Sequence, residues 1–362
     1  MRMFVKHELN KVEVGTMNGM RWMTAAALVV ALPGLASAGD KLNVVSWGGA
    51  YSESQNKAFV EPFKKAGNDV TTEDYNGEIA KIRAQVESKN VTWDVIDIDT
   101  QTALAACAEG VLEKIDWKKL GLDRGKFIGG NLQDCAVPNI VYATVLAYDT
   151  TKFKEGPAKT ADLFDLKKFP GKRGLQKNPF VNLEWALIAD GVKQSEVYRV
   201  LKTKAGVDRA FKKLDTIKDQ VVWWEAGAQP PQLLADGQVA MTSAWNGRIY
   251  DAVKKDKKPF AIIWDNQGFD WDWWSIVKGG PHKETAYKFI SYASDPVRMA
   301  DQTHYISYGP ANKDAIPNVD KDVLPNLPTA AVNMKTALIV DVKFWADNGD
   351  ALRERFKAWL AK

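Results

Sequence analysis

Short apolar runs and amphipathic segments alternate along most of the chain. Runs typical of buried strands lie at 42–46, 70–75, 93–98, 140–148, 221–224, 239–244, 260–264 and 273–277. Segments with helical spacing lie at 52–65, 78–89, 100–109, 183–188, 210–217, 230–234, 285–293, 296–303 and 350–360. Because strands and helices alternate, the pattern predicts an α/β protein with a parallel, doubly wound sheet covered on both faces.

The run at 140–148, IVYATVLAY, is long and apolar enough to cross between two lobes. The polar, lysine-rich stretch 150–172 that follows it is typical of the start of a new unit. A chain of 362 residues has enough material for two domains. We therefore predict two αβ lobes joined by more than one crossover.

The N-terminal segment predicts export from the cytoplasm. An apolar block at 24–32 follows Arg21 and precedes the small-residue motif Ala36-Ser37-Ala38, which is typical of a secretory signal peptide covering residues 1–38. The block is shorter than the ~20 residues of a spanning helix. Translation could start at Met1, Met17 or Met20, and the sequence leaves this choice open.

The charge balance and the cysteines narrow the function class. The formal charge of +4 comes from 49 basic and 45 acidic residues, which does not support a nucleic-acid partner. Cys107 and Cys135 form a disulfide in the simplest interpretation, worth ~3 kcal/mol, and two buried free thiols are the alternative. Beyond the leader only His282 and His304 remain, so we expect no metal site and no cofactor.

Catalytic motifs are absent, whereas tryptophan is abundant. The chain has no GxSxG nucleophile motif and no phosphate-binding glycine loop. It contains 14 tryptophans, and seven of them lie between Trp223 and Trp274. Since sugars stack on indoles and paired carboxylates are plentiful, a secreted glycan-active hydrolase stays an alternative of another class.

Two neighbouring motifs favour a binding site instead. Trp245-Asn246-Gly247-Arg248 ends one predicted strand, and Asp270-Trp271-Asp272-Trp273-Trp274 begins the next. An arginine would hold a ligand carboxylate, an aspartate would pair with an ammonium group, and tryptophan would attract the cation. Alternatively, Arg248 and Asp272 form a structural salt bridge among core tryptophans.

The same motifs resemble a known family. The leader, the SWGGAY loop, the DVIDID strand, the AYD crossing, LLADGQVAM, AWNGR and DWDWWSIVKG resemble the periplasmic spermidine/putrescine-binding proteins, the solute receptors of ABC importers. The resemblance implies a bilobal type II periplasmic-binding fold with a hinged ligand cleft. It implies lobe 1 at 39–146 plus 273–314 and lobe 2 at 147–272 plus 315–362. It further implies a monomer without catalytic activity that delivers its ligand to an ABC permease in the inner membrane.

The resemblance also implies ligand-binding residues and a ligand class. The expected ligand-binding residues are Trp47, Asp99, Gln101, Phe180, Trp245, Arg248, Trp271 and Asp272. Asp99 could equally cap the helix that it precedes, and Tyr308 is either a cleft residue or a hinge element. Asn178 and Val181 stand where polyamine receptors carry acids, and Arg248 adds a cation, as in the γ-aminobutyrate receptors of the family. We therefore expect a zwitterionic ω-amino acid, with putrescine or spermidine as the alternative ligand.

Overall fold

The computed structural model describes residues 40–362, so the predicted signal peptide lies outside the described residues. The strands are β1 (Lys41–Ser46), β2 (Asp69–Asp74), β3 (Val95–Asp99), β4 (Ala136–Asp149), β5 (Arg173–Gln176), β6 (Val221–Trp224), β7 (Met241–Trp245), β8 (Phe260–Ile276), β9 (Gly309–Pro310) and β10 (Leu338–Ile339). The α-helices are α1 (Gly49–Gln55), α2 (Glu61–Lys65), α3 (Ile79–Glu87), α4 (Thr100–Ala108), α5 (Trp117–Leu120), α6 (Asn182–Ala189), α7 (Val197–Leu201), α8 (Lys204–Asp215), α9 (Gln229–Ala235), α10 (Asn246–Lys254), α11 (Lys283–Ala293), α12 (Pro296–Gln302) and α13 (Val342–Leu360). None of these helices has both the length and the apolar character of a membrane-spanning segment.

The described strands form one mixed sheet in the order β2-β1-β3-β8-β4-β7-β5-β6, with β9 paired to β4 and β10 to β8. Toward each end of this order the pairs are parallel: β1 with β2 and β3, and β5 with β6 and β7. At the centre, β8 is antiparallel to β3 and β4, and β4 is antiparallel to β7. The predicted α/β class is confirmed, whereas an entirely parallel sheet is wrong because β4 and β8 run in opposite directions.

Strand β8 joins two segments that the hydrophobic pattern predicts as separate strands. Its middle is polar, which interrupts the apolar pattern, yet Gly268 still pairs with Thr144 of β4. The buried Gln267 amide donates hydrogen bonds to the carbonyl oxygens of Pro328 and Asn333. Since these distant carbonyls accept from both N–H groups of the amide, a polar residue is accommodated inside the strand.

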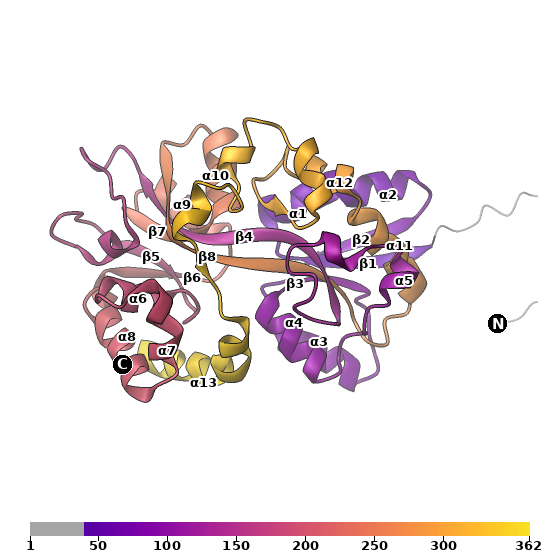
Figure 1. The fold of residues 1–362 in the computed structure, drawn as a ribbon, viewed down its shortest axis with the longest axis horizontal. Helices are drawn as coiled ribbons and strands as arrows, with labels where there is room; N and C mark the ends of the chain where they lie inside the picture. Colours follow the sequence, from indigo (N-terminus) through magenta and orange to yellow (C-terminus); the bar gives the residue numbers. More distant parts are fainter. Residues whose placement is uncertain (1–39) are drawn as a thin grey trace, which may run out of the picture. The chain divides into compact units, whose positions relative to one another are not determined.

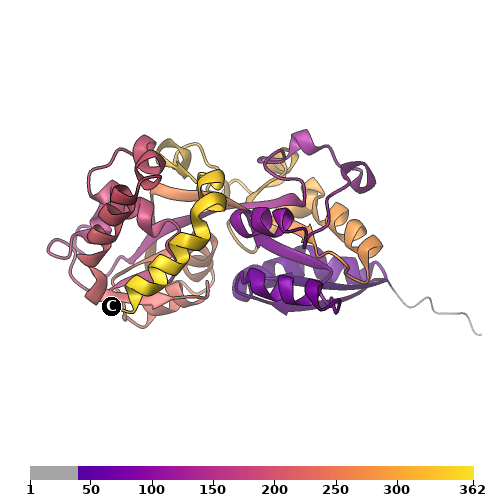
Figure 2. The same cartoon turned by 90° about the horizontal axis from the view of Figure 1, so that it is seen from below.

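The elements form two halves that share β4 and β8. In Figures 1 and 2, β1–β3, α1–α5, α11 and α12 gather at one end of these strands, and β5–β7 with α6–α10 and α13 gather toward the other. Each half has its own buried cluster: Phe59 and Phe289 lie in the first, and Trp185 and Phe344 in the second. Because residues 40–362 belong to one compact unit, the predicted lobe boundaries stay a prediction.

A disulfide links Cys107 of α4 to Cys135, the residue before β4, as the cysteine count predicts. Cys135 is fully buried in a cluster with Ala103 and Ala106 of α4. The bond therefore ties α4 to the beginning of the central strand.

Replacing both cysteines by serine should lower the free energy of unfolding by about 3 to 4 kcal/mol, because the cross-link closes a loop across 28 residues. Urea denaturation of the oxidised protein and of the Cys107→Ser, Cys135→Ser variant measures this difference. Wild-type protein under reducing conditions is the control and should unfold like the variant. Equal midpoints for the oxidised and reduced wild type would contradict a stabilising role of the bond.

Candidate functional site

The turn between β1 and α1 needs glycine at two positions. Gly48 and Gly49 have φ angles of +70° and +56°, in the left-handed region that favours glycine. A Cβ on Gly48 would lie 3.0 Å from a carboxylate oxygen of Asp74, and one on Gly49 would lie 3.0 Å from Nη1 of Arg248. The two glycines thus allow the chain to turn after Trp47 into α1, which begins at Gly49, and allow Arg248 to approach the turn.

Five aromatic side chains and Asp272 surround a small cavity. We call the five the aromatic box: Trp47 after β1, Tyr51 of α1, Tyr142 of β4, Trp245 at the end of β7, and Tyr308 before β9. The ring centres of Trp47 and Trp245 are 5.8 Å apart, and both rings meet edge to face. The cavity measures about 20 Å³, which holds one water-sized group. Electron-rich rings around such a cavity attract a cationic head group.

Asp272 is the acidic group of the aromatic box. Its side chain is only 7% exposed. Burial raises its pKa well above the usual range, the nearby charges of Asp97, Asp99 and Asp270 raise it further, and Arg248 lowers it. No hydrogen bond from the described residues stabilises its charged form. A cation in the box would therefore relieve an unfavourable buried charge.

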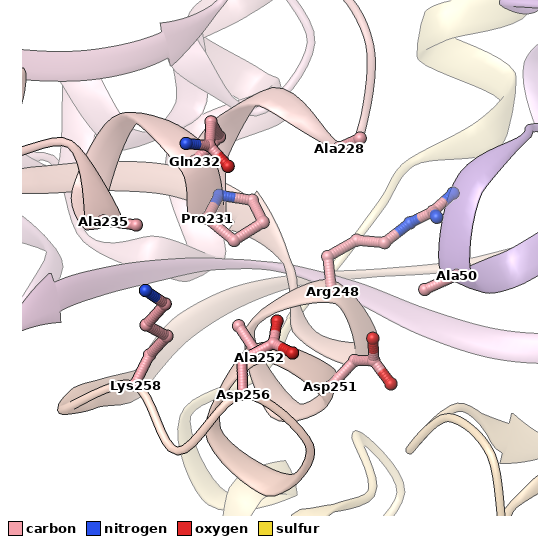
Figure 3. Close-up of a pocket in the computed structure, with 10 residues that line it drawn as sticks. All are labelled: Ala50, Ala228, Pro231, Gln232, Ala235, Arg248, Asp251, Ala252, Asp256 and Lys258. Carbon is pink, nitrogen blue, oxygen red and sulfur yellow. The ribbon is translucent and has the colours of Figure 1, made fainter.

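Arg248 lies beside the box and has an unused donor. Its Nη1 donates a hydrogen bond of 2.8 Å to the carbonyl of Gly48, whereas its buried Nε has no partner among the described residues. The guanidinium carbon lies 5.9 Å from the ring centres of Tyr51 and of Trp245. Figure 3 shows the side chain extending from α10 toward Ala50, along a cavity of about 190 Å³.

The geometry of Arg248 and Asp272 bears on one of the two interpretations of this pair, the structural salt bridge. Arg248 and Asp272 form no ion pair within the described part, so a structural salt bridge between them does not hold. Their charges still interact, because Arg248 lowers the pKa of Asp272. The site thus places an unpaired carboxylate and a partly unpaired guanidinium on neighbouring sides of the same aromatic residues.

A larger cavity of about 660 Å³ shares Trp47, Tyr142 and Trp245 with the box. We call it the outer cavity, and Asp99, Gln101 and Phe180 line it together with Asn76, Glu78, Arg83, Gln176, Asn178, Asp350, Arg353, Glu354 and Lys357. Arg83 pairs with Glu109, and Arg353 pairs with Asp350. Both arginines of the outer cavity therefore already have an acidic partner, in contrast to Arg248.

Asp99 is a helix cap that also borders the outer cavity. Its carboxylate caps α4 by accepting hydrogen bonds from the backbone N–H and the hydroxyl of Thr102, at 2.9 and 2.8 Å. It also lines the outer cavity, and it stands opposite Asp272 in the antiparallel pairing of β3 with β8. Burial raises the pKa of Asp99, and the negative charge of its ionised form in turn raises the pKa of Asp272.

The structure does not bring Trp271 to the box. Successive side chains along a strand point to opposite faces, so Trp271 faces away from the side on which Asp272 lines the box. It lines a surface groove with Leu104, Leu132 and Ile339. Of the eight expected residues, three lie at the box, three at the outer cavity, Arg248 beside the box, and Trp271 elsewhere.

Three tyrosines of the box are missing from the expected set. Tyr308, left open as a cleft residue or a hinge element, lies in the box. Tyr51 lies in the first turn of α1, soon after Trp47, so the predicted helix could have suggested that its side chain lies near that of Trp47. Tyr142 lies inside the apolar run of β4 and carries no signal of its own. Within residues 40–362 no group of three or more His, Cys, Asp or Glu side chains is arranged to hold a metal ion.

Comparisons of the sequence and of the structure with known proteins both find solute-binding proteins. The family described as bacterial extracellular solute-binding protein matches residues 58–329. A Pseudomonas aeruginosa protein named gamma-aminobutyric acid-binding protein is 44% identical over 324 residues, covering 89% of this chain and 92% of that protein. The binding protein MotA of A. tumefaciens B6, solved with glucopine, has a TM-score of 0.83 and 34% identity, covering 88% and 99% of the chains. A solved GABA receptor has a TM-score of 0.78 and 33% identity, covering 89% and 98%.

The buried acids predict how the stability of the ligand-free protein depends on pH. Burial raises the pKa of Asp97 and of Asp270 to about 7, and that of Glu184 likewise to about 7. Between about pH 4 and 7 the folded protein therefore binds more protons than the unfolded chain, so stability falls as the pH rises through this window. We expect a thermal midpoint several degrees higher at pH 5.5 than at pH 8. A midpoint that rises with pH over this range would contradict the raised pKa values.

Proposed function

Because this chain belongs to the bacterial extracellular solute-binding protein family, with the type II periplasmic-binding fold of its relatives, we propose that it captures a small ω-amino acid such as γ-aminobutyrate. One observation carries the proposal. In the part of the chain that the structure describes, the buried Asp272 has no cationic partner, the Nε of Arg248 has no acceptor, and both side chains lie next to the same aromatic residues. A zwitterion satisfies both groups at once.

The ammonium group of the ligand binds in the aromatic box. There it pairs with the carboxylate of Asp272, while the rings add cation–π attraction and exclude water. The box holds one water-sized group, which suits a primary ammonium. Because water is excluded, the ion pair is stronger than it would be at the protein surface.

The carboxylate of the ligand binds Arg248. A guanidinium can donate two parallel hydrogen bonds to a carboxylate, and the buried Nε of Arg248 is a free donor for one of them. A diamine such as putrescine would instead bring a second positive charge near the guanidinium, which is unfavourable. The names of the 44% identical relative and of the solved GABA receptor support the ω-amino acid over the polyamine.

One observation favours the polyamine alternative. Asp97, Asp99 and Asp270 lie close enough to Asp272 to raise its pKa, so acids outnumber the single Arg248 around the box. At the outer cavity, however, Asn178 provides an amide where a polyamine receptor would carry an acid. The glycan-hydrolase alternative receives no support from the relatives described above, whose names describe binding proteins.

The rest of the cycle is part of the same proposal, and the family match supports it. The protein is exported by a leader at residues 1–38 and works as a monomer in the periplasm. It closes around its ligand without chemical conversion and delivers it to an ABC permease in the inner membrane. The shared strands β4 and β8 are the connection about which the halves would move.

Arg248→Ala should weaken γ-aminobutyrate binding by at least about 30-fold, because truncating one partner of a buried charge pair costs ~2 kcal/mol or more. Calorimetric titration with γ-aminobutyrate, 5-aminovalerate, putrescine and spermidine measures the effect. Arg353→Ala is the matched control, since it removes a paired arginine at the outer cavity. A large loss in the control and none in Arg248→Ala would place the ligand carboxylate at the outer cavity instead.

Asp272→Asn should abolish binding of the ω-amino acids and of putrescine alike, because each needs an anionic partner for its ammonium. The same change should raise the thermal midpoint of the ligand-free protein at pH 8, since it removes an unfavourable buried charge. Thermal unfolding with and without ligand tests both effects on one sample, because ligand at 100 times its dissociation constant adds about 2.7 kcal/mol. A variant that is more stable and still binds would contradict the role of Asp272.

A further inference from the structure

A second carboxylate lies directly behind the aromatic box. Asp97 of β3 is fully buried and accepts hydrogen bonds from the indole N–H of Trp47 at 3.1 Å and from the hydroxyl of Tyr51 at 2.9 Å. The side-chain amides of Gln55 and Asn139 donate to the same carboxylate, at 2.5 and 2.7 Å. Four neutral donors and no cation among the described side chains thus surround this acid.

Stability alone does not explain a carboxylate at this position. Moving a charge out of water is costly, and neutral hydrogen bonds repay the cost only in part. Burial accordingly raises the pKa of Asp97 to about 7 although all four hydrogen bonds lower it. Two of its donors, Trp47 and Tyr51, belong to the aromatic box, so a role of this acid in ligand binding explains its position better.

We propose that Asp97 is a positioning and specificity-determining residue that holds Trp47 and Tyr51 in the aromatic box and adds a second negative charge behind the ammonium site. The proposal rests on the proposed function only in requiring a ligand with an ammonium group. It therefore holds for an ω-amino acid and for a polyamine alike.

The positioning effect follows from the contacts of Trp47. Its ring packs against Gly77, where a Cβ would approach to 2.8 Å, and against Tyr75 with ring centres 5.0 Å apart. The hydroxyl of Tyr75 donates to the backbone carbonyl of Asp97 at 2.8 Å. The ring of Trp47 is thus fixed by packing on one side and by the hydrogen bond to Asp97 on the other.

The electrostatic effect follows from the surroundings of Asp97. Titratable and charged groups from every neighbouring element face Asp97 or act on the nearby Asp272. They are Tyr51 of α1, Tyr75 after β2, Asp99 of β3, Tyr142 of β4, Arg248 of α10, Asp270 and Asp272 of β8, and Tyr308 before β9. Arg248 is the cation in this set, and it lies beside the box. An ammonium in the box would favour the charged forms of Asp97 and Asp272, so affinity should rise as Asp97 loses its proton.

The other half of the protein provides a matched control. Glu184 of α6 is also fully buried, with its pKa raised to about 7 by burial. It too accepts hydrogen bonds from one indole N–H, that of Trp345 at 2.7 Å, and from one tyrosine hydroxyl, that of Tyr198 at 3.1 Å. Glu184 lines neither the box nor the outer cavity. Its replacement therefore removes a buried carboxylate with hydrogen bonds similar to those of Asp97, at a position away from the proposed ligand.

Asp97→Asn and Glu184→Gln remove the two charges with little change of shape. The amide oxygens of Gln55 and Asn139 have no partner in the structure, so these side chains can turn and accept from the new amide. We therefore expect Asp97→Asn to fold. The experiment is calorimetric titration of wild type and both variants with γ-aminobutyrate and putrescine at pH 6 and pH 8, with thermal unfolding of each.

We expect Asp97→Asn to weaken binding about tenfold or more at pH 8 and by less than about threefold at pH 6, where Asp97 of the wild type is largely protonated. Glu184→Gln should bind like wild type at both pH values. Equal losses for Asp97→Asn at the two pH values would overturn the electrostatic role, and wild-type affinity at pH 8 would overturn the proposal altogether. Should the variant not fold, a wild-type affinity that does not rise between pH 6 and 8 would overturn the electrostatic role.

The two proposals fail in different ways. Wild-type protein that binds none of the amines would refute the proposed function and leave Asp97 without a ligand to act on. Wild-type protein that binds, combined with an unaffected Asp97→Asn variant, would refute only the role of Asp97.

Discussion

The pairing of β8 with β3 and β4 is the constraint on which the candidate binding site depends. It sets Asp272 opposite Asp99 on one side and opposite Ile140 on the other. Side chains alternate along a strand, so a slip of one residue would turn Asp272 to the outer face and bring Trp271 to the box. The complete burial of Trp273 and Trp274 opposes such a slip, since it would expose one and misplace the other.

The same pairing concentrates negative charge in the interior. Asp97, Asp99, Asp270 and Asp272 all belong to β3 or β8, and burial raises the pKa of each. A stable core does not need these acids, because apolar side chains of similar volume would pack at least as well. Sites that are tuned for a ligand commonly sacrifice stability in this way. The proposed binding of an ammonium group and the stability of the fold would therefore be coupled through the same carboxylates.

Much of the architecture could be predicted from the sequence. The resemblance to solute receptors of ABC importers is confirmed by the family match and by relatives above 30% identity. The crossing strand at 140–148 corresponds to β4, and the C-terminal helix corresponds to α13, which begins earlier than predicted. The continuity of β8 was not predictable, because the side-chain N–H groups of its buried Gln267 donate to carbonyl oxygens far along the chain. Periodicity could, however, have separated Trp271 from Asp272, since neighbouring residues of one strand face opposite sides.

The tryptophan cluster shows why residue type alone could not define the site. Of the seven tryptophans from Trp223 to Trp274, Trp245 is the one that lines the box. Trp224 supports it from behind, with ring centres 5.7 Å apart and an edge-to-face arrangement. Trp273 donates from its indole N–H to the hydroxyl of Thr100, which in turn donates to Asp270 at 2.6 Å. The cluster thus marks the region of the candidate site, although Trp224 and Trp273 contact other side chains there and do not line the box.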